Sequence, residues 1–205
     1  MNIEVKNSLK PIDYAKSMKV LEERANDVFL GKKDELLWIV EHNSVYTAGT
    51  SSNKTDLLDK SIKIIKTNRG GKYTYHGPGQ KVVYFVLNLN KRGKDIRKLI
   101  NKIENCIIEI LKEYKIKSYA DKKNIGIWIG KKADNEKIAA IGIRIRKWVA
   151  YHGFSINLST DLKKYDGIVP CGLKNKSITS FKKLGINNYK NIDKIIIKKF
   201  LNTFL

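Results

Sequence analysis

Cysteine, proline and long apolar runs are all scarce in this chain of 205 residues. Only two cysteines are present, Cys106 and Cys171, so a disulfide-stapled fold is not expected, and both would be thiols in a reducing compartment. No stretch approaches the roughly 18 apolar residues of a membrane span, and the opening MNIEVKNSLKP lacks the apolar core of a secretory signal. These absences predict a cytoplasmic protein that does not enter a membrane.

Acidic residues are also few, with 20 Asp and Glu against 41 Lys and Arg, which gives a net charge of +21. A lysine-rich composition that places lysine on every solvated face accounts for much of this charge. Such a charge favours encounters with acidic partners. The basic residues are scattered, without the dense tract or basic–aromatic repeat of many nucleic-acid-binding segments. The net positive charge therefore suits an acidic protein substrate as well as a nucleic acid. A basic nucleic-acid-binding domain is kept as an alternative.

Apolar periodicity predicts an α/β fold in one domain spanning residues 1–205. Helical spacing is found over 13–31, 95–114 and 192–205. Short apolar or alternating runs predict strands at 36–42, 62–67, 82–89, 125–130, 141–146 and 149–158. We expect loops at 43–59, where 45–49 could extend the preceding strand, at 69–80 and at 161–171, and a short helix or turn at 177–184. Many strands close in sequence predict a mixed, largely antiparallel sheet flanked by helices.

Four glycines and one proline fall within the twelve residues RGGKYTYHGPGQ at 69–80. This composition predicts a tight loop whose backbone approaches another group closely. The loop is not a phosphate-binding P-loop, because Gly71-Lys72 is followed by Tyr73 rather than Ser or Thr, and it does not match the dinucleotide fingerprint. Neither ATP nor NAD is therefore implied. A plain hairpin turn is the alternative interpretation, but the interleaved Arg, Thr and His exceed what a hairpin needs.

Cys171, in the sequence Pro-Cys-Gly, is the leading candidate for chemistry. Thiolates attack and leave readily, which suits thioester exchange, and a turn can present the side chain to a cleft; an inert thiol is the alternative. Lys137 precedes the apolar run IAAI, where desolvation would lower its pKa and let it act as a general base, although a solvated charge is the ordinary interpretation of one lysine among many. Cys106 lies inside a predicted helix, so we expect a core or edge thiol.

Only three histidines are present. His76 and His152 each precede a glycine, so either could pair with Cys171 as in a Cys-His hydrolase, or could hold a loop through hydrogen bonds, which we favour. His42 ends an apolar strand and is expected to be structural. No Cys-x-x-Cys or His-Glu-x-x-His spacing is present, so the sequence predicts no metal site.

Three segments together resemble the lipoyl(octanoyl) transferase family. They are RGGKYTYHGPGQ at 69–80, KIAAIGIRIRKWVAYHGFSINL at 137–158 and IVPCG at 168–172, in the family's order, with Cys171 34 positions after Lys137. The segment EHNSVYTAG is similar to the family's early strand motif, but Asn43 and Ser44 replace a Pro-Pro-like pair, and Phe85 stands where proline is frequent. These departures concern local loop shape, away from the lysine and the cysteine.

The resemblance implies a cytoplasmic octanoyltransferase that needs no cofactor or metal, with a fold similar to the catalytic domain of biotin and lipoate protein ligases. Such an enzyme moves an octanoyl group from octanoyl-acyl carrier protein to a lysine of the lipoyl domains of 2-oxoacid dehydrogenase acyltransferase subunits or of the glycine-cleavage H protein. This is the first step of endogenous protein lipoylation, and it involves neither nucleic acid nor a membrane.

By motif match, the resemblance also implies the site residues. Cys171 would be the acyl-thioester nucleophile, and Lys137 would lower its pKa. The residues that would bind the acyl substrate are Arg69, Gly70, Gly71, Lys72, Tyr73, Thr74, Tyr75, His76, Ala140, Ile141, Gly142, Gly153, Phe154 and Ser155.

Three other functions make different demands on these residues. An ATP-dependent lipoate or biotin protein ligase of similar fold forms an adenylate and needs a lysine but no nucleophilic cysteine, so Cys171 speaks against it. A nucleic-acid-binding domain would be indifferent to the loss of Cys171. A Cys-His hydrolase would require His76 or His152 in place of Lys137.

Overall fold

The computed structural model describes residues 2–122, 124–131, 134–169 and 177–205. The predicted nucleophile, Cys171, lies outside these ranges. Of the helices within them, none combines the length and apolarity that crossing a bilayer requires.

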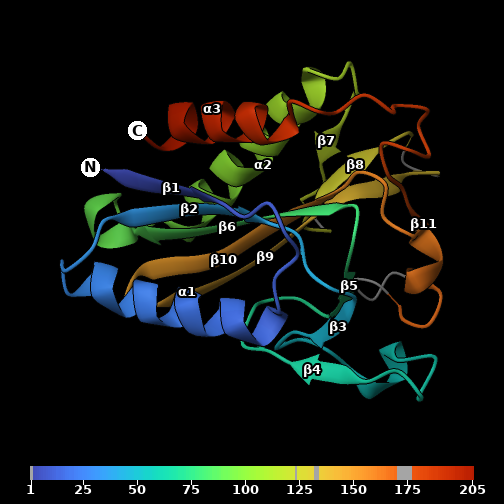
Figure 1. Cartoon of the computed structure of the whole chain (residues 1–205), viewed down its shortest axis with the longest axis horizontal. Helices are drawn as coiled ribbons and strands as arrows, with labels where there is room; N and C mark the ends of the chain where they lie inside the picture. The colour runs from blue at the N-terminus through green and yellow to red at the C-terminus, as the bar shows by residue number, and fades with distance from the viewer. Residues whose placement is uncertain (1, 123, 132–133, 170–176) are drawn as a thin grey trace.

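Most strands of the described chain belong to one main sheet (Figure 1). Its order is β1-β2-β6-β10-β9-β8-β7, and β11 pairs with β9. The bounds are β1 Ile3–Asn7, β2 Glu35–Val40, β6 Gln80–Asn88, β7 Tyr119–Ala120, β8 Ile127–Ile129, β9 Glu136–Arg146, β10 Val149–Asn157 and β11 Ser177–Ile178. The pairs β1–β2 and β11–β9 are parallel and the others antiparallel, which confirms the expected mixed, largely antiparallel sheet.

Helices cover both faces of this sheet. Figure 1 shows α1 (Tyr14–Phe29) on one face and α2 (Ile96–Lys112) with α3 (Ile192–Phe204) on the other. Because both faces are covered, β6 and β10 are buried along nearly their whole length, which explains their continuous apolar runs. Asp95 caps α2, where its carboxylate accepts a hydrogen bond from the Lys98 backbone N–H. Cys106 is only 2% exposed within α2 and is a core thiol, as expected.

A second, three-stranded sheet lies at one end of the main sheet and corrects two of our expectations (Figure 1). Its strands are β3 Val45–Ala48, β4 Ile64–Lys66 and β5 Tyr73–His76. Residues 45–49 therefore do not extend β2, and part of the predicted loop at 69–80 is a strand. The reason is tertiary: β3 pairs antiparallel with β5, and the rings of Tyr46 and Tyr75 lie 5.1 Å apart. A four-residue alternation is too short to reveal this from sequence.

Three further differences are small. Strands β1 and β7 were not expected. Ser177 and Ile178 form a strand on β9 before a turn, so 177–184 is not a helix. Short 3₁₀ helices occur at Lys54–Asp56, Leu89–Lys91 and Leu162–Tyr165, the first and the last within predicted loops.

Candidate active site

Arg69 fixes the glycine loop, by which we mean residues 69–72, between the two sheets. Its guanidinium is buried and donates to the carbonyl oxygens of Thr47 (3.1 Å), Lys72 (2.9 Å) and Gly70 (3.0 Å), and to the hydroxyl of Thr47 (2.7 Å). The Gly70 N–H donates to the carbonyl of Ile143 in β9 (3.0 Å). A buried cation is thus stabilised by backbone and hydroxyl oxygens, and the loop is attached to both β3 and β9.

His76 holds the turn that follows β5. Its Nδ1 lies 2.6 Å from Oε1 of Gln80, while Nε2 of Gln80 donates to Asn157 Oδ1 and to the Tyr165 hydroxyl (both 2.9 Å). Because the amide nitrogen of Gln80 is committed as a donor, its oxygen accepts, and His76 carries its proton on Nδ1. Burial lowers the pKa of His76 to about 3, so the ring is neutral. This arrangement is the loop-holding role that the sequence favoured.

His42 and His152 make similar structural contacts. Nδ1 of His42 lies 2.8 Å from the Ile12 carbonyl, and its Nε2 lies 2.7 Å from the Tyr84 hydroxyl. Nε2 of His152 lies 2.8 Å from Oδ1 of Asn68, the residue that precedes the glycine loop. Burial, followed by the nearby guanidiniums, lowers the pKa of His152 to about 3. The hydrogen bonds of all three rings are thus made to structural groups, and that of His152 lies next to the glycine loop.

Lys137 is the second residue of β9 and its side chain is held in the protein, with 2% of the residue exposed. Its Nζ donates to the carbonyl of Ile125 (3.0 Å) and lies 4.6 Å from the centre of the Trp128 ring. Gly126 makes room for this arrangement: its φ is +132°, and a Cβ there would lie 3.0 Å from Cε of Lys137. Sequence reasoning missed Gly126, although a glycine inside the alternating run IGIWIG is the usual sign of a close approach.

A narrow cavity, which we name the chamber, lies beside the glycine loop and has a volume of about 60 Å³. It is lined by thirteen of the fourteen residues expected to bind the acyl substrate, drawn from β5, β9, β10 and the loop. The exception is Tyr75, whose hydroxyl lies 2.9 Å from Ser44 Oγ and whose ring contacts Tyr165. Segments that are far apart in sequence are thus brought to one cavity.

The chamber also has walls that no motif indicated. Tyr14 of α1 lines it, stacked on His76 with ring centres 5.9 Å apart, together with Val82 and Tyr84 of β6. His152, which belongs to the segment 137–158, lines it as well. Tyr14 lies outside the three motif segments, and only the packing of α1 against the sheet brings it there.

A wider cavity of about 660 Å³, which we name the groove, adjoins the chamber. Lys137 lines the groove together with isoleucines of β9 and α2. Both cavities are lined by Gly70, Gly71, Lys72, Ile141 and Gly142, so the glycine loop and the middle of β9 form their common border. The candidate lysine and the candidate acyl-binding residues therefore belong to two adjoining cavities.

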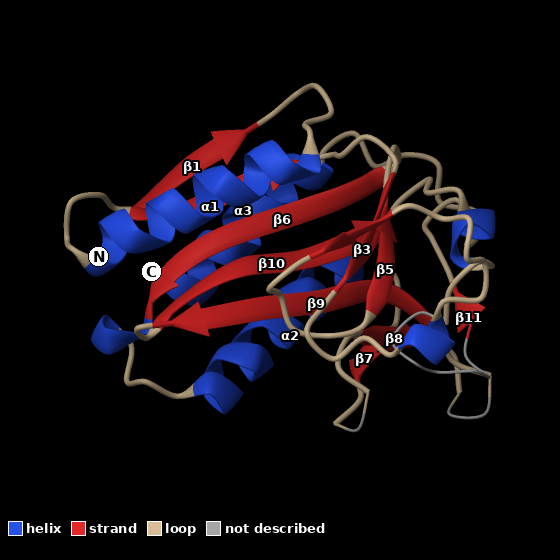
Figure 2. Ribbon diagram, turned by 90° about the horizontal axis from the view of Figure 1, so that it is seen from below, coloured by secondary structure: helices blue, strands red, loops and turns tan. Residues whose placement is uncertain are grey.

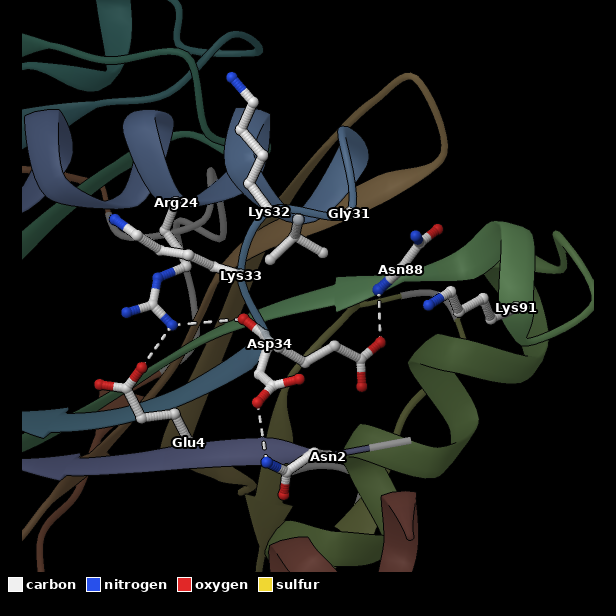
Figure 3. Close-up of a pocket in the computed structure, with 11 residues that line it drawn as sticks. Asn2, Glu4, Arg24, Gly31, Lys32, Lys33, Asp34, Asn88 and Lys91 are labelled. Carbon is white, nitrogen blue, oxygen red and sulfur yellow. Dashed lines mark hydrogen bonds and ion pairs between the residues drawn. The ribbon is translucent and has the colours of Figure 1, made fainter.

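Another pocket, of about 490 Å³, lies near the end of α1 and contains none of the expected site residues (Figure 3). Two side-chain hydrogen bonds cross it: Arg24 donates to Glu4 (2.7 Å), and Asn2 donates to Asp34 (2.8 Å). In the described part of the chain, no group of three or more His, Cys, Asp or Glu could hold a metal ion. We therefore take the chamber and the groove as the candidate site.

Comparison with known proteins agrees with this fold. The family model of the lipoyl protein ligase A/B catalytic domain matches residues 13–202. An octanoyltransferase of Ehrlichia chaffeensis is 47% identical over 98% of this chain and 96% of that relative. An octanoyltransferase of Rickettsia conorii is 47% identical over 94% of each chain. A bipartite lipoate protein ligase from Thermoplasma acidophilum, solved in work that includes its E2 lipoyl domain, superposes with a TM-score of 0.73 at 13% identity, covering 98% of this chain and 84% of that one.

The structural match establishes the fold, which is that of lipoate protein ligase catalytic domains, as expected from the motifs. The two sequence relatives go further, because their identity extends over nearly the whole chain. The chain belongs to the octanoyltransferase family and is an acyltransferase.

Proposed function

We propose that this chain is a single-domain cytoplasmic enzyme that transfers an octanoyl group from octanoyl-acyl carrier protein to a lysine of a lipoyl domain, through a thioester on Cys171. The observation that carries the proposal is the position of Lys137, whose oriented amine lines the groove next to the chamber. Cys171 is proposed as the nucleophile because of family membership and its position in the IVPCG motif. The acceptor domains are those of 2-oxoacid dehydrogenase acyltransferase subunits and the glycine-cleavage H protein.

The first half-reaction forms the acyl-enzyme. Lys137 takes the proton of the Cys171 thiol, and the thiolate attacks the carbonyl carbon of the donor thioester. The bond from that carbon to the carrier sulfur breaks, and the departing thiolate receives the proton back from Lys137. The Ile125 carbonyl holds one N–H of Lys137, which orients the amine for both transfers.

The second half-reaction makes the amide. The amine of the acceptor lysine attacks the acyl carbon, the bond from that carbon to the Cys171 sulfur breaks, and the amine proton passes through Lys137 to the cysteine thiolate. The donor is already an activated thioester, so the chemistry balances without ATP.

The chamber is the proposed site for the octanoyl chain, which must widen it from about 60 Å³ on binding. Phe154, Ile141 and Val82 offer it apolar surface. Gly142 and Gly70 let the two backbones that border it approach closely, since a Cβ on Gly142 would lie 3.3 Å from the Gly70 carbonyl oxygen. Burial keeps His76 and His152 neutral there, so neither adds a charge beside an alkyl chain.

Intact-protein mass spectrometry after mixing with octanoyl-acyl carrier protein tests the proposal. We expect one octanoyl adduct that is absent in Cys171→Ser, present in Cys106→Ser, and discharged when a lipoyl domain is added. Absence of both adduct and transfer would overturn the octanoyltransferase proposal. If the wild type and Cys171→Ser both transfer the octanoyl group and neither carries an adduct, the thioester intermediate is overturned and direct transfer remains.

An ATP-dependent ligase is the second candidate, because solved structures of similar fold include a lipoate protein ligase A bound with ATP. It predicts that octanoate is attached to a lipoyl domain only when ATP is added, and that Cys171→Ser retains this activity. Octanoyl transfer from the carrier protein in the absence of ATP would exclude it.

A further inference from the structure

The floor of the groove is one face of β9. Lys137, Ile141, Ile143 and Ile145 all line it, and they occupy alternate positions of the strand. Because side chains of a strand alternate between faces with a period of two, these residues point to the same side. At ~3.3 Å per residue, the eight steps from Lys137 to Ile145 correspond to about 26 Å. The groove is therefore a long apolar track that begins at the candidate base.

Two walls confine this track. On one side are Ile96 and Ile100, which are four residues apart and share a face of α2; Figure 2 shows α2 running beside β9. On the other side is the glycine loop, through Gly70, Gly71 and Lys72. Ile96 is 43% exposed, so apolar surface remains open to an incoming ligand.

The end of the track farthest from Lys137 is basic. We name this basic end by two exposed residues at the start of α2, Lys94 and Arg97, which flank the groove residue Ile96 in sequence. Nζ of Lys94 lies 6.0 Å from the ring centre of Trp148, which brings the start of α2 next to the turn between β9 and β10. Asp95 lies between Lys94 and Arg97 in sequence, and its carboxylate already accepts a hydrogen bond from the Lys98 backbone N–H. Apolar and cationic surface thus meet at this end.

We infer that the groove receives the pantetheine arm of the donor and that the acidic body of the carrier protein docks on the basic end. This inference rests on the proposed function. An extended arm of about fifteen bonds reaches about 17 Å. If the thioester at one end of the arm lies at Lys137, the phosphate at the other end lies roughly two-thirds of the way along the track. The carrier body then covers the remaining third, over Ile145, Ile96 and the exposed cations.

Length and charge distinguish this occupant from the other two participants. The acceptor lysine is a short side chain, so its domain must sit close to Lys137 and cannot act from the far end of the groove. The octanoyl chain carries no charge and gains nothing from the basic end. Only the donor presents both a long arm and, next to it, an acidic surface, for which electrostatic complementarity raises the association rate.

Charge reversal at the basic end tests the docking. The double variant Lys94→Glu and Arg97→Glu is compared with Lys32→Glu and Lys33→Glu, an equal change of charge at the separate pocket shown in Figure 3. The rate of acyl-enzyme formation is measured with octanoyl-acyl carrier protein and with octanoyl-pantetheine. We expect the first variant to lower kcat/KM for the carrier protein at least about tenfold more than the control does, and to act within twofold of wild type on octanoyl-pantetheine.

A second variant tests the track itself. Ile143→Trp fills the groove midway, so we expect KM to rise at least about fivefold for both donors, while thermal melting verifies the fold. Discharge of preformed acyl-enzyme by a lipoyl domain should be unchanged by the charge reversals.

Each other outcome overturns the inference. Equal losses in both charge variants would mean only general attraction by the net charge, and slower discharge in the first would make the basic end the acceptor's surface. An unchanged KM for octanoyl-pantetheine in Ile143→Trp would remove the arm from the groove. If the wild-type chain forms no acyl-enzyme with either donor, the proposed function itself fails, which separates the two failures.

Discussion

Gly126 should be essential for the position of Lys137, although it takes no part in the chemistry. With φ at +132°, alanine there adopts a backbone conformation that side chains rarely tolerate, which costs about 1–3 kcal/mol. The new Cβ would lie 2.9 Å from the Ala139 carbonyl oxygen and 3.0 Å and 3.2 Å from Cε and Nζ of Lys137. Strand backbone moves little, so the flexible lysine end should give way and lose its contact with the Ile125 carbonyl.

A misplacement of about 1 Å in a catalytic group costs about 100-fold in rate. We therefore expect Gly126→Ala to form the octanoyl-enzyme about 100-fold more slowly while its free energy of unfolding falls by about 1–3 kcal/mol. The assay is a time course of adduct formation by intact-protein mass spectrometry, together with urea unfolding.

Gly185→Ala is the matched control. Gly185 also has a positive φ, +78°, but nothing lies within 4 Å of the position that a Cβ would occupy there. This variant should lose about 1 kcal/mol of stability and keep the wild-type acylation rate. If Gly126→Ala acylates at the wild-type rate while it loses stability, or if both variants slow equally, the proposed link between Gly126 and Lys137 is refuted.

Four further predictions follow from burial and spacing. Gly153→Ala should destabilise by about 3 kcal/mol or more in urea unfolding, because its Cβ would lie 1.9 Å from the Val83 carbonyl oxygen; near-wild-type stability would contradict the packing. Gly142→Ala should unfold normally but raise the donor KM a few-fold, since its Cβ meets the Gly70 carbonyl at 3.3 Å; an unchanged KM would separate Gly142 from the substrate path. The pKa of His152 is lowered from 6.5 to about 3 in the folded protein. Between these pH values the unfolded chain binds one more proton than the folded chain. The free energy of unfolding therefore falls as pH drops through this window, by up to about 1.4 kcal/mol per pH unit. His152→Asn, which suits the positive φ of 71°, should reduce that slope by about one proton, and an unchanged slope would contradict the neutral buried ring. Burial raises the pKa of Cys106 to about 12, so iodoacetamide at pH 8 should leave it unmodified in the folded protein, as peptide mapping would reveal.

Local patterns in the sequence were sufficient for the framework of this protein. Local periodicity predicts the helices α1, α2 and α3 and the strands β6 and β10, because helix and strand periods differ and these elements are long. The three motif segments identified the family, and the residues they contain gather around the chamber with the exception of Tyr75.

The tertiary structure decided what depends on partners distant in the chain. Strands β3 and β5 are stabilised by each other across the sheet, so neither carries an independent signal. Tyr14 reaches the chamber because α1 packs over the main sheet, and Gly126 matters because the side chain of Lys137, on the next strand, passes over it. The groove also requires the fold, since alternate isoleucines of β9 form a track only when α2 and the glycine loop stand on either side. Periodicity is a property of neighbours in sequence, whereas a cavity is a property of surfaces that meet only after folding.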